Sequence, residues 1–403
     1  MSEKWPGGLI RKTPPTVVGP TDGEGGSAPG VWTLDQAMEY EKQGLWPKPP
    51  LPKQLWSWGA NGVGQLAKND LTYRSSPVQI GALTNWSSVV MGHGSNISAL
   101  QSDSTLWSWG SGYGGGLGLN SATNRSSPVQ VGALSTWAKI ACGLFATFAI
   151  QTNGTLWSWG FNNSGQLGQN DTANRSSPVQ IGALTTWSEV SAGLYFCAAI
   201  KTDGTLWAWG LNSSGQLGLN DVINRSSPVQ IGSLTNWSKV ASGRVFALAI
   251  KNDGTLWSWG NNNLGQLGLN DTAYRSSPVQ VGTLTNWYQI AGGAFNSVST
   301  KNDGTLWAWG NNGDGQLGLN DVTNRSSPVQ IGALSTWSKI TATLSSNGAI
   351  KTDKTLWAWG ANSSGQLGLN DISSRSSPVQ VGALTTWAHV AALSTSMFAL
   401  KTP

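Results

Sequence analysis

The chain has 403 residues, and only 11% of them are charged, against roughly 25% in an average soluble domain. The formal net charge is +5, and residues 51–403 carry 19 basic and 13 acidic side chains, dispersed along their length. This weak bias excludes the clustered basic surface that binding to nucleic acid requires. No apolar stretch approaches the length of a membrane span, and Cys142 and Cys197 are expected to be buried thiols.

Residues 1–50 differ in kind from the rest of the chain. Residues 6–30 are rich in Gly and Pro and lack apolar periodicity, which predicts an extended arm. Thr33 and Gln36 have the spacing of a capping box and Gly44 can end a helix, so a short helix is predicted over about 33–44. Because so short a helix is marginal alone in water, we expect it to dock onto something. The candidate docking residues are Trp32, Leu34, Met38, Tyr40, Leu45 and Trp46.

Residues 51–403 consist of a repeat of about 50 residues. The motif Leu-Trp-Ser/Ala-Trp-Gly occurs seven times, beginning at Leu55, Leu106, Leu156, Leu206, Leu256, Leu306 and Leu356. A second block, Arg-Ser-Ser-Pro-Val-Gln, also occurs seven times and keeps step with the first. A period of this length is typical of the blades of a β-propeller.

Each repeat is predicted to contain four strands. In one copy the first two are residues 187–192 and 196–201, with a hairpin turn at Asp203-Gly204 before the third strand, residues 205–210. A glycine-punctuated loop follows, and the fourth strand is predicted from Pro228 onward. A leading proline suits an outer edge, where a missing N–H costs no ladder hydrogen bond.

The two ends of the repeat region complement one another. The chain stops where a hairpin turn would come next, and the first copy begins with the strand that should follow that turn. We therefore expect the N- and C-terminal strands to pair within one shared blade and close the ring. The predicted fold is all-β: a seven-bladed propeller of four-stranded blades, preceded by an extended arm with one short helix.

Tryptophan and arginine recur at fixed positions. Of the 24 tryptophans, 21 occupy three positions per repeat, which predicts a buried structural layer rather than a cofactor site. Most of the repeated arginines follow an aspartate by four residues, as in Asp171 and Arg175 or Asp221 and Arg225. This spacing predicts local ion pairs that brace a loop.

The repeat resembles that of the RCC1 family of seven-bladed propellers. The resemblance rests on Leu206-Trp-Ala-Trp-Gly, Asn212-Ser-Ser-Gly-Gln-Leu-Gly, the proline strand and Val240-Ala-Ser-Gly, and it covers residues 53–403. The second copy departs from the pattern, with Tyr113-Gly-Gly-Gly and Ser121. The family includes nucleotide-exchange and chromatin-binding proteins and bacterial inhibitors of other proteins. The exchange factor uses a wedge insertion, for which the even spacing here leaves no room.

A second resemblance concerns the arm. The segment Ala28-Pro-Gly-Val-Trp-Thr-Leu-Asp-Gln-Ala, with Gly44-Leu-Trp-Pro47, is similar to a short segment in structural proteins of tailed phages. It covers about 20 residues. The start of the chain lacks the apolar core of a signal peptide, so we expect synthesis in the host cytoplasm.

Enzyme chemistry is not indicated by the sequence. His93 and His389 lie in different repeats and different columns, so no triad or metal site is predicted. The Gly-rich loops recur in every copy and carry no phosphate-binding lysine, which excludes a P-loop. We predict no catalytic residue, no cofactor and no metal.

Specificity is expected where the copies differ. The largest scatter follows the first strand of each repeat, and these positions are predicted to form a binding face around one end of the channel: His93, Phe145, Tyr195, Phe196, Arg244, Phe246 and Phe295. Aromatic residues and arginine are favoured at binding hot spots. The alternative is that the aromatics fill the channel or pack between blades. A second position that varies between copies follows the Trp-Gly of the motif. It holds Phe161 and Leu211 in adjacent blades, and these two residues are candidates for an exposed apolar patch.

The function predicted from these features is that of a non-enzymatic virion structural protein of a tailed phage. Residues 1–50 would dock to other virion proteins, and the propeller would act as a fibre, decoration or host-contact module present in several copies. Its face would contact a host-surface protein or glycan. The alternatives are a free protein-binding or inhibitory propeller, and a carbohydrate-binding propeller.

Overall fold

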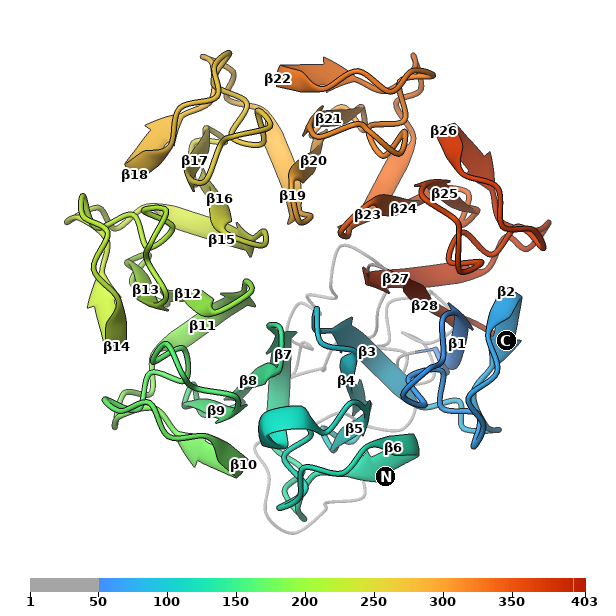
Figure 1. Cartoon of the computed structure of the whole chain (residues 1–403), viewed down its shortest axis with the longest axis horizontal. Helices are drawn as coiled ribbons and strands as arrows, with labels where there is room; N and C mark the ends of the chain where they lie inside the picture. Colours follow the sequence, from blue (N-terminus) through green and yellow to red (C-terminus); the bar gives the residue numbers. More distant parts are fainter. Residues whose placement is uncertain (1–50, 394) are drawn as a thin grey trace, which may run out of the picture. The chain divides into compact units, whose positions relative to one another are not determined.

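The computed structural model describes residues 51–393 and 395–403. Residues Lys53–Pro403 form one compact unit of seven four-stranded antiparallel sheets, arranged as blades around a central channel (Figure 1). This confirms the predicted propeller. The predicted helix at 33–44 and the six candidate docking residues of the arm lie outside the described residues.

Four strands build each blade from the channel outward. The inner strands are β3 (Trp86–Met91), β7 (Trp137–Cys142), β11 (Trp187–Ala192), β15 (Trp237–Ser242), β19 (Trp287–Gly292), β23 (Trp337–Ala342) and β27 (Trp387–Leu393). The second strands are β4 (Asn96–Gln101), β8 (Ala146–Gln151), β12 (Phe196–Lys201), β16 (Phe246–Lys251), β20 (Asn296–Lys301), β24 (Ser346–Lys351) and β28 (Ser396–Lys401).

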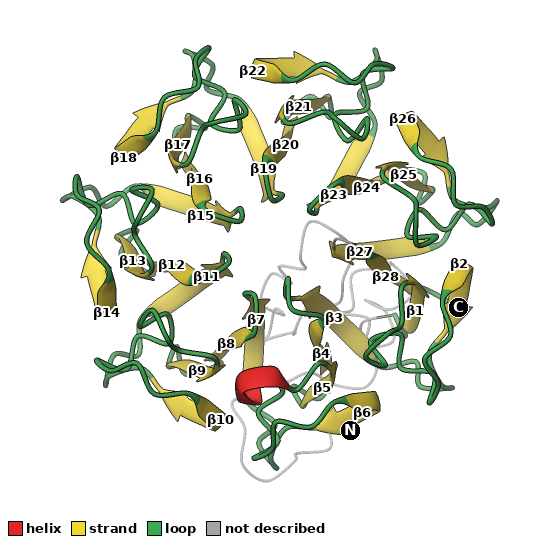
Figure 2. Cartoon of the chain, in the orientation of Figure 1, coloured by secondary structure: helices red, strands yellow, loops and turns green. Residues whose placement is uncertain are grey.

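The third and outer strands complete the blades. The third strands are β1 (Gln54–Gly59), β5 (Leu106–Gly110), β9 (Leu156–Gly160), β13 (Leu206–Gly210), β17 (Leu256–Gly260), β21 (Leu306–Gly310) and β25 (Leu356–Gly360). The outer strands are β2 (Arg74–Gln79), β6 (Arg125–Gln130), β10 (Arg175–Gln180), β14 (Arg225–Gln230), β18 (Arg275–Gln280), β22 (Arg325–Gln330) and β26 (Arg375–Gln380). Within the described part of the chain, the one helix is the 3₁₀ turn η1 (Tyr113–Gly115) (Figure 2).

The outer strand starts earlier than predicted. It begins at Arg225 rather than at Pro228, because Arg225 pairs with Gly210 across an irregularity in the register. A bulge of this kind inserts residues that side-chain alternation does not reveal. Pro228 still lies on the edge strand, as expected.

One blade contains both ends of the propeller. Its order is β2-β1-β28-β27, and β1 pairs antiparallel with β28 from Gln54 opposite Lys401 to Gly59 opposite Ser396. The predicted closure of the ring is therefore confirmed. Because β1 pairs with β28, neither of these two strands remains as a free edge.

A buried tryptophan joins neighbouring blades. The second tryptophan of the repeated motif is fully buried, and in six blades its Nε1 donates a 2.9 Å hydrogen bond to the backbone carbonyl of a glutamine in the preceding long loop, as from Trp209 to Gln166. Gly168 in that loop has a φ of +71°, and a Cβ there would lie 2.8 Å from Trp209 Nε1. A side chain at this glycine would therefore separate the two blades.

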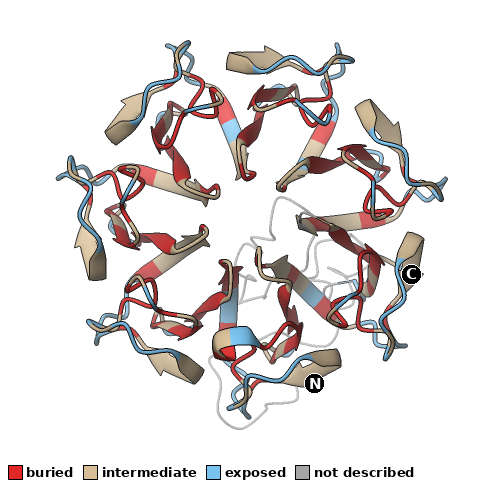
Figure 3. Cartoon of the chain, in the orientation of Figure 1, coloured by how far each residue is buried: buried red, intermediate tan, exposed pale blue. Residues whose placement is uncertain are grey.

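The three tryptophan positions do not share one environment. The tryptophan that starts each inner strand and the second one of the motif are buried, as predicted. The first one of the motif, such as Trp257, is only partly buried, so the prediction of a wholly buried layer is wrong for one position in three. Buried residues follow the second and third strands, and exposed residues lie mainly on the loops (Figure 3).

The predicted ion pairs are present in six blades. The distances between arginine and aspartate are 2.5 to 2.7 Å, and the pairs are Asp70–Arg74, Asp171–Arg175, Asp221–Arg225, Asp271–Arg275, Asp321–Arg325 and Asp371–Arg375. In the remaining blade Ser121 replaces the aspartate, and Arg125 instead donates to Thr123 Oγ1 at 2.8 Å.

Ring closure yields the first testable prediction. Deleting residues 391–403 removes β28, the partner of both β1 and β27, together with the buried side chains of Met397, Phe398 and Leu400. We expect the whole ring to lose its cooperative thermal transition in circular dichroism, because two blade edges open at once. Deleting exposed Pro403 alone is the control and should leave the transition unchanged. A transition of the shortened chain within a few degrees of the full chain would contradict the shared blade.

Candidate binding face

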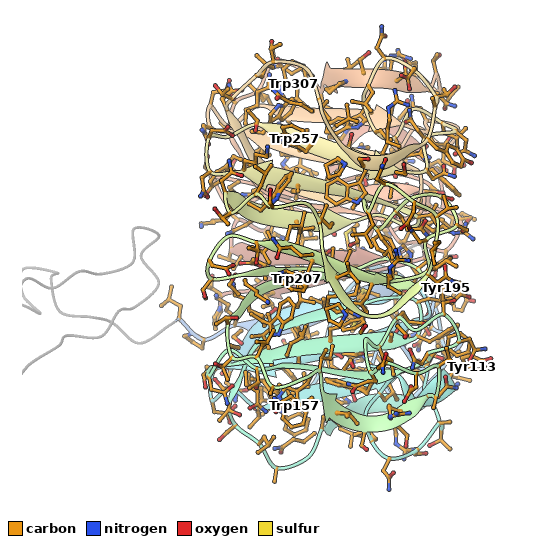
Figure 4. The ribbon with its side chains drawn as sticks, turned by 90° about the vertical axis from the view of Figure 1, so that its left-hand side faces the viewer. Tyr113, Trp157, Tyr195, Trp207, Trp257 and Trp307 are labelled. Carbon is orange, nitrogen blue, oxygen red and sulfur yellow. The ribbon has the colours of Figure 1, made fainter. Side chains whose placement is uncertain are left out.

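Two sets of loops share one end of the propeller. Because the strands of each blade are antiparallel, the loop between the inner and second strands and the long loop between the third and outer strands emerge at the same end. Tyr113 and Tyr195 lie at this end, whereas Trp157, Trp207, Trp257 and Trp307 lie nearer the opposite end (Figure 4). The positions that vary between repeats are therefore collected on one face.

Four aromatic rings from three neighbouring blades form a cluster on this face, here called the aromatic patch. Tyr113 lies 4.7 Å from Phe145 and 5.8 Å from Phe161, measured between ring centroids, and Phe161 lies 6.0 Å from Tyr195. These are contact distances for aromatic pairs. Tyr113 is 56% exposed, and the other three rings are partly buried. The patch thus presents an accessible apolar surface on an otherwise repetitive ring.

The departure of the second copy from the repeat explains the position of Tyr113. Gly114 and Gly115 have φ values of +65° and +84°, which few residues other than glycine adopt, and they allow the turn η1. Gly116 replaces the glutamine that braces the other long loops, and its carbonyl accepts from Thr147 Oγ1 at 2.9 Å. Trp159 Nε1, buried in the next blade, has no partner among the described residues.

Backbone hydrogen bonds join the inner loops from blade to blade. Leu144 N donates to Leu194 O at 3.3 Å, Leu194 N to Arg244 O at 2.9 Å, Arg244 N to Gly293 O at 3.1 Å, and Ala294 N to Thr343 O at 3.0 Å. These bonds link five consecutive blades into a collar around the channel mouth. Because the collar fixes the loop backbone, Phe145 and Tyr195 are held in place before any partner binds.

Arg244 lies on the collar, and His93 lies at the same end of the propeller in the loop between β3 and β4. The guanidinium of Arg244 lies 5.3 Å from the ring centroid of Phe295 on the next blade. Burial of the imidazole, together with the positive charge of Arg244, lowers the pKa of His93 to about 4. His93 lies three blades before Arg244.

The structure places five of the seven predicted face residues in loops at this end of the propeller. Phe145 and Tyr195 belong to the aromatic patch, Arg244 and Phe295 lie on the collar, and His93 lies in the loop between β3 and β4, one blade before the collar begins. The two remaining residues, Phe196 and Phe246, are corrections: they are 1% and 0% exposed and pack in the cores between blades. Each begins a second strand, where side chains on both faces of the blade are covered.

Two members of the patch were not among the predicted face residues. Phe161 was expected only in a smaller variable column with Leu211, and it instead bridges Tyr113 and Tyr195. Tyr113 was visible in the sequence only as part of the aberrant second copy. That break in the repeat was the available signal for the site.

Among the described residues there is no metal-binding cluster and no activated thiol. Within residues 51–393 and 395–403, no group of three His, Cys, Asp or Glu side chains could hold a metal ion. Cys142 and Cys197 are free and buried, and burial raises the pKa of the Cys142 thiol to about 11 and that of Cys197 well above its ordinary value. Neither thiol is therefore poised as a nucleophile. Over the same residues, no helix is long and apolar enough to span a bilayer.

The chain is a seven-bladed β-propeller with a localised cluster of aromatic residues on one face. The chain belongs to the RCC1-like domain family, whose model matches residues 54–399. Three similar solved structures share 19 to 21% identity and each covers 87% of this chain. Yeast RCC1 (Prp20) bound to Kap60 aligns over 89% of its length with a TM-score of 0.77. Saccharomyces cerevisiae Prp20p, described with its binding to Gsp1p and histones, aligns over 92% of its length with a TM-score of 0.78. Human WBSCR16 aligns over 99% of its length with a TM-score of 0.76.

The second prediction concerns His93. An ordinary histidine in the unfolded chain has a pKa of about 6.5, and the folded value is about 4. The unfolded state therefore binds the proton first as pH falls, so stability is full above pH 6.5 and declines toward pH 4. At pH 4.5 we expect a loss of roughly 2 kcal/mol relative to pH 7.

His93→Gln should remove most of this decline, because glutamine does not titrate. Denaturant unfolding of both proteins at pH 7 and pH 4.5 measures the difference. The aspartates of the ion pairs have pKa values lowered below 3.8, so their contribution to stability declines mainly below about pH 5. This decline is the same in both proteins and cancels in the comparison. An equal decline in the two proteins would show that His93 is not held neutral.

Proposed function

We propose that this chain is a non-catalytic virion protein of a tailed phage, in which residues 1–50 attach to the particle and the propeller presents the aromatic patch to the host surface. The observation that carries the binding role is the patch itself, since it gathers the departures from a repeated scaffold at one place. The attachment role rests on the similarity of residues 28–47 to a segment of phage structural proteins. Both parts are proposals about one display protein.

The composition of the patch supports a protein partner. Tyrosine provides apolar area and a hydroxyl on a side chain with few rotamers, so little entropy is lost on binding. The neighbouring Arg244 is supported by Phe295 and offers a planar group for hydrogen bonds. Yeast Prp20, a propeller of the same fold, binds Kap60, Gsp1p and histones, and protein binding by this chain is consistent with that precedent.

A free protein-binding or inhibitory propeller is the second candidate. It would use the same patch, and its partner would bind without any particle. The two candidates differ in the role of residues 1–50, which matter for assembly only in the first.

The third prediction tests attachment. Phage particles produced with a chain lacking residues 1–50 should contain none of this protein, because the docking segment is gone, while the recombinant shortened chain keeps its thermal transition. Mass spectrometry of purified particles measures incorporation. Particles that contain the shortened chain at the normal level would rule out this role for residues 1–50 and leave the free-propeller candidate.

The fourth prediction tests the patch. Changing Tyr113, Phe161 and Tyr195 together to serine should weaken binding of the labelled chain to host cells at least about tenfold, since a hot-spot aromatic contributes about 2 kcal/mol or more. The matched control is Tyr73→Ser with Tyr274→Ser, which removes two tyrosines that are 56% and 50% exposed and lie outside the patch. Equal binding by the triple variant and the control would contradict the proposed face.

A further inference from the structure

Clefts recur between the outer strands of neighbouring blades. Five of them have volumes between about 350 and 550 Å³. Each contains the partly buried first tryptophan of the Leu-Trp-Ser/Ala-Trp-Gly motif, and these are Trp56, Trp107, Trp257, Trp307 and Trp357. The volumes fall within the range of small-ligand sites.

The cleft between β14 and β18 illustrates the apolar part of the lining. Trp257 contacts buried Trp237, with 5.9 Å between ring centroids, and Lys251 Nζ lies 3.6 Å from the Trp257 ring centroid. Leu234, which is 46% exposed, and Pro278 line the same cleft. Lys251 covers one face of the Trp257 ring, so the apolar surface of the cleft consists of the remainder of this indole together with Leu234 and Pro278.

Polar groups lie at the edge of this surface. Asn220 accepts a hydrogen bond from Ser277 Oγ at 3.2 Å, while its amide nitrogen and the side chain of Gln230 have no partner among the described residues. Amide groups of this kind both donate and accept hydrogen bonds. The cleft therefore offers unused hydrogen-bonding capacity next to an apolar floor.

The charged groups at the cleft between β14 and β18 have partners of opposite charge. Arg225 is paired with Asp221 at 2.5 Å, and the carboxylate of Asp253 acts electrostatically on Lys251. A charged ligand would have to compete with these partners. A neutral ligand that is apolar on one side and rich in hydroxyl groups on its edge matches the lining better.

We infer that these clefts bind neutral saccharides, with the C–H face of a pyranose ring against the tryptophan and hydroxyl groups on the asparagine and glutamine. This goes beyond the proposed function, because it concerns the outer wall of the propeller and not the aromatic patch or residues 1–50. A polymer with a repeating hexose unit can occupy several clefts at once. Such multivalent binding exceeds the affinity of one site by roughly 10²–10⁴-fold.

Seven glycines, one in each loop that follows an outer strand, allow side chains to be added beside the clefts without disturbing the fold. Each has a φ between +57° and +64°, and an added Cβ would meet nothing within 4 Å: Gly81, Gly132, Gly182, Gly232, Gly282, Gly332 and Gly382. Asparagine tolerates this left-handed conformation better than other side chains. Five of these glycines line the five clefts, so changing all seven to asparagine adds a polar side chain at the border of each cleft.

The fifth prediction follows from this design. In native affinity electrophoresis with the full chain, at least one of the neutral polymers dextran, mannan and galactan should retard the protein, and the sevenfold Gly→Asn variant should lose that retardation. The control variant carries asparagine on the opposite face, at Gly62, Ser213, Gly313 and Ser363, and should be retarded like the native chain. Thermal midpoints verify that all variants are folded.

Three outcomes would overturn the inference: no retardation by any neutral polymer, retardation only by dextran sulfate, or equal retardation of the sevenfold variant. The triple variant of the aromatic patch should still be retarded, so a failure of the proposed function and a failure of this inference are distinguishable.

A second measurement needs no variant. In the native chain labelled with ¹⁵N-tryptophan, the polymer's monosaccharide should shift indole signals of the seven partly buried tryptophans, whose Nε1 groups in most blades donate to a threonine hydroxyl, as from Trp257 to Thr255 at 2.9 Å. Signals of the fourteen buried tryptophans should stay in place. Shifts confined to the buried set, or none at all, would contradict binding in the clefts.

Discussion

The contact on which this ring depends is the buried indole of one blade under the long loop of the blade before it. Trp209 illustrates it: the ring is fully buried, its Nε1 donates to Gln166 O at 2.9 Å, and Gly168 leaves just enough room above it. A blade of four short strands cannot bury both of its faces alone, so each repeat is stable only between neighbours. The second strands, buried along their length, show the result. Closure by β1 and β28 supplies the same contact where the chain begins and ends, through Trp58 and Gln366.

Repetition made most of this architecture predictable. Seven copies in register specify the blade count. The strands predicted at 187–192 and 196–201 have the bounds that the structure has, and the third strand, predicted from Thr205, begins at Leu206. Alternation fails where the register is irregular, which is why the start of the outer strand was placed at Pro228 instead of Arg225. A bulge depends on pairing geometry between strands, and a single strand's sequence does not encode it directly.

The binding face was harder to predict because neighbouring positions have opposite environments. Tyr195 lies in a loop and reaches the aromatic patch, while Phe196 starts β12 and is buried between blades. Variation between copies identifies the loop, but the direction of each side chain depends on the residue at which the strand begins. Moving that boundary by one residue exchanges an exposed side chain for a buried one. The same limit applies to tryptophan. The three tryptophan positions recur with equal regularity, so the sequence does not indicate that the first tryptophan of the motif, such as Trp257, lines an open cleft.

The second copy shows how recognition and stability are connected in such a ring. In the next blade Trp159 Nε1 is buried without a partner among the described residues, and an unsatisfied buried donor costs about 1–3 kcal/mol. Gly114 and Gly115 of the adjoining loop permit the turn η1, which places Tyr113 against Phe145 and Phe161. One blade boundary is thus weakened at the place where the aromatic patch forms, while the other six keep the full contact. A loss at one of seven equivalent boundaries is tolerable because the closed ring distributes stability over all of them, and that redundancy allows the aromatic patch to form in one sector.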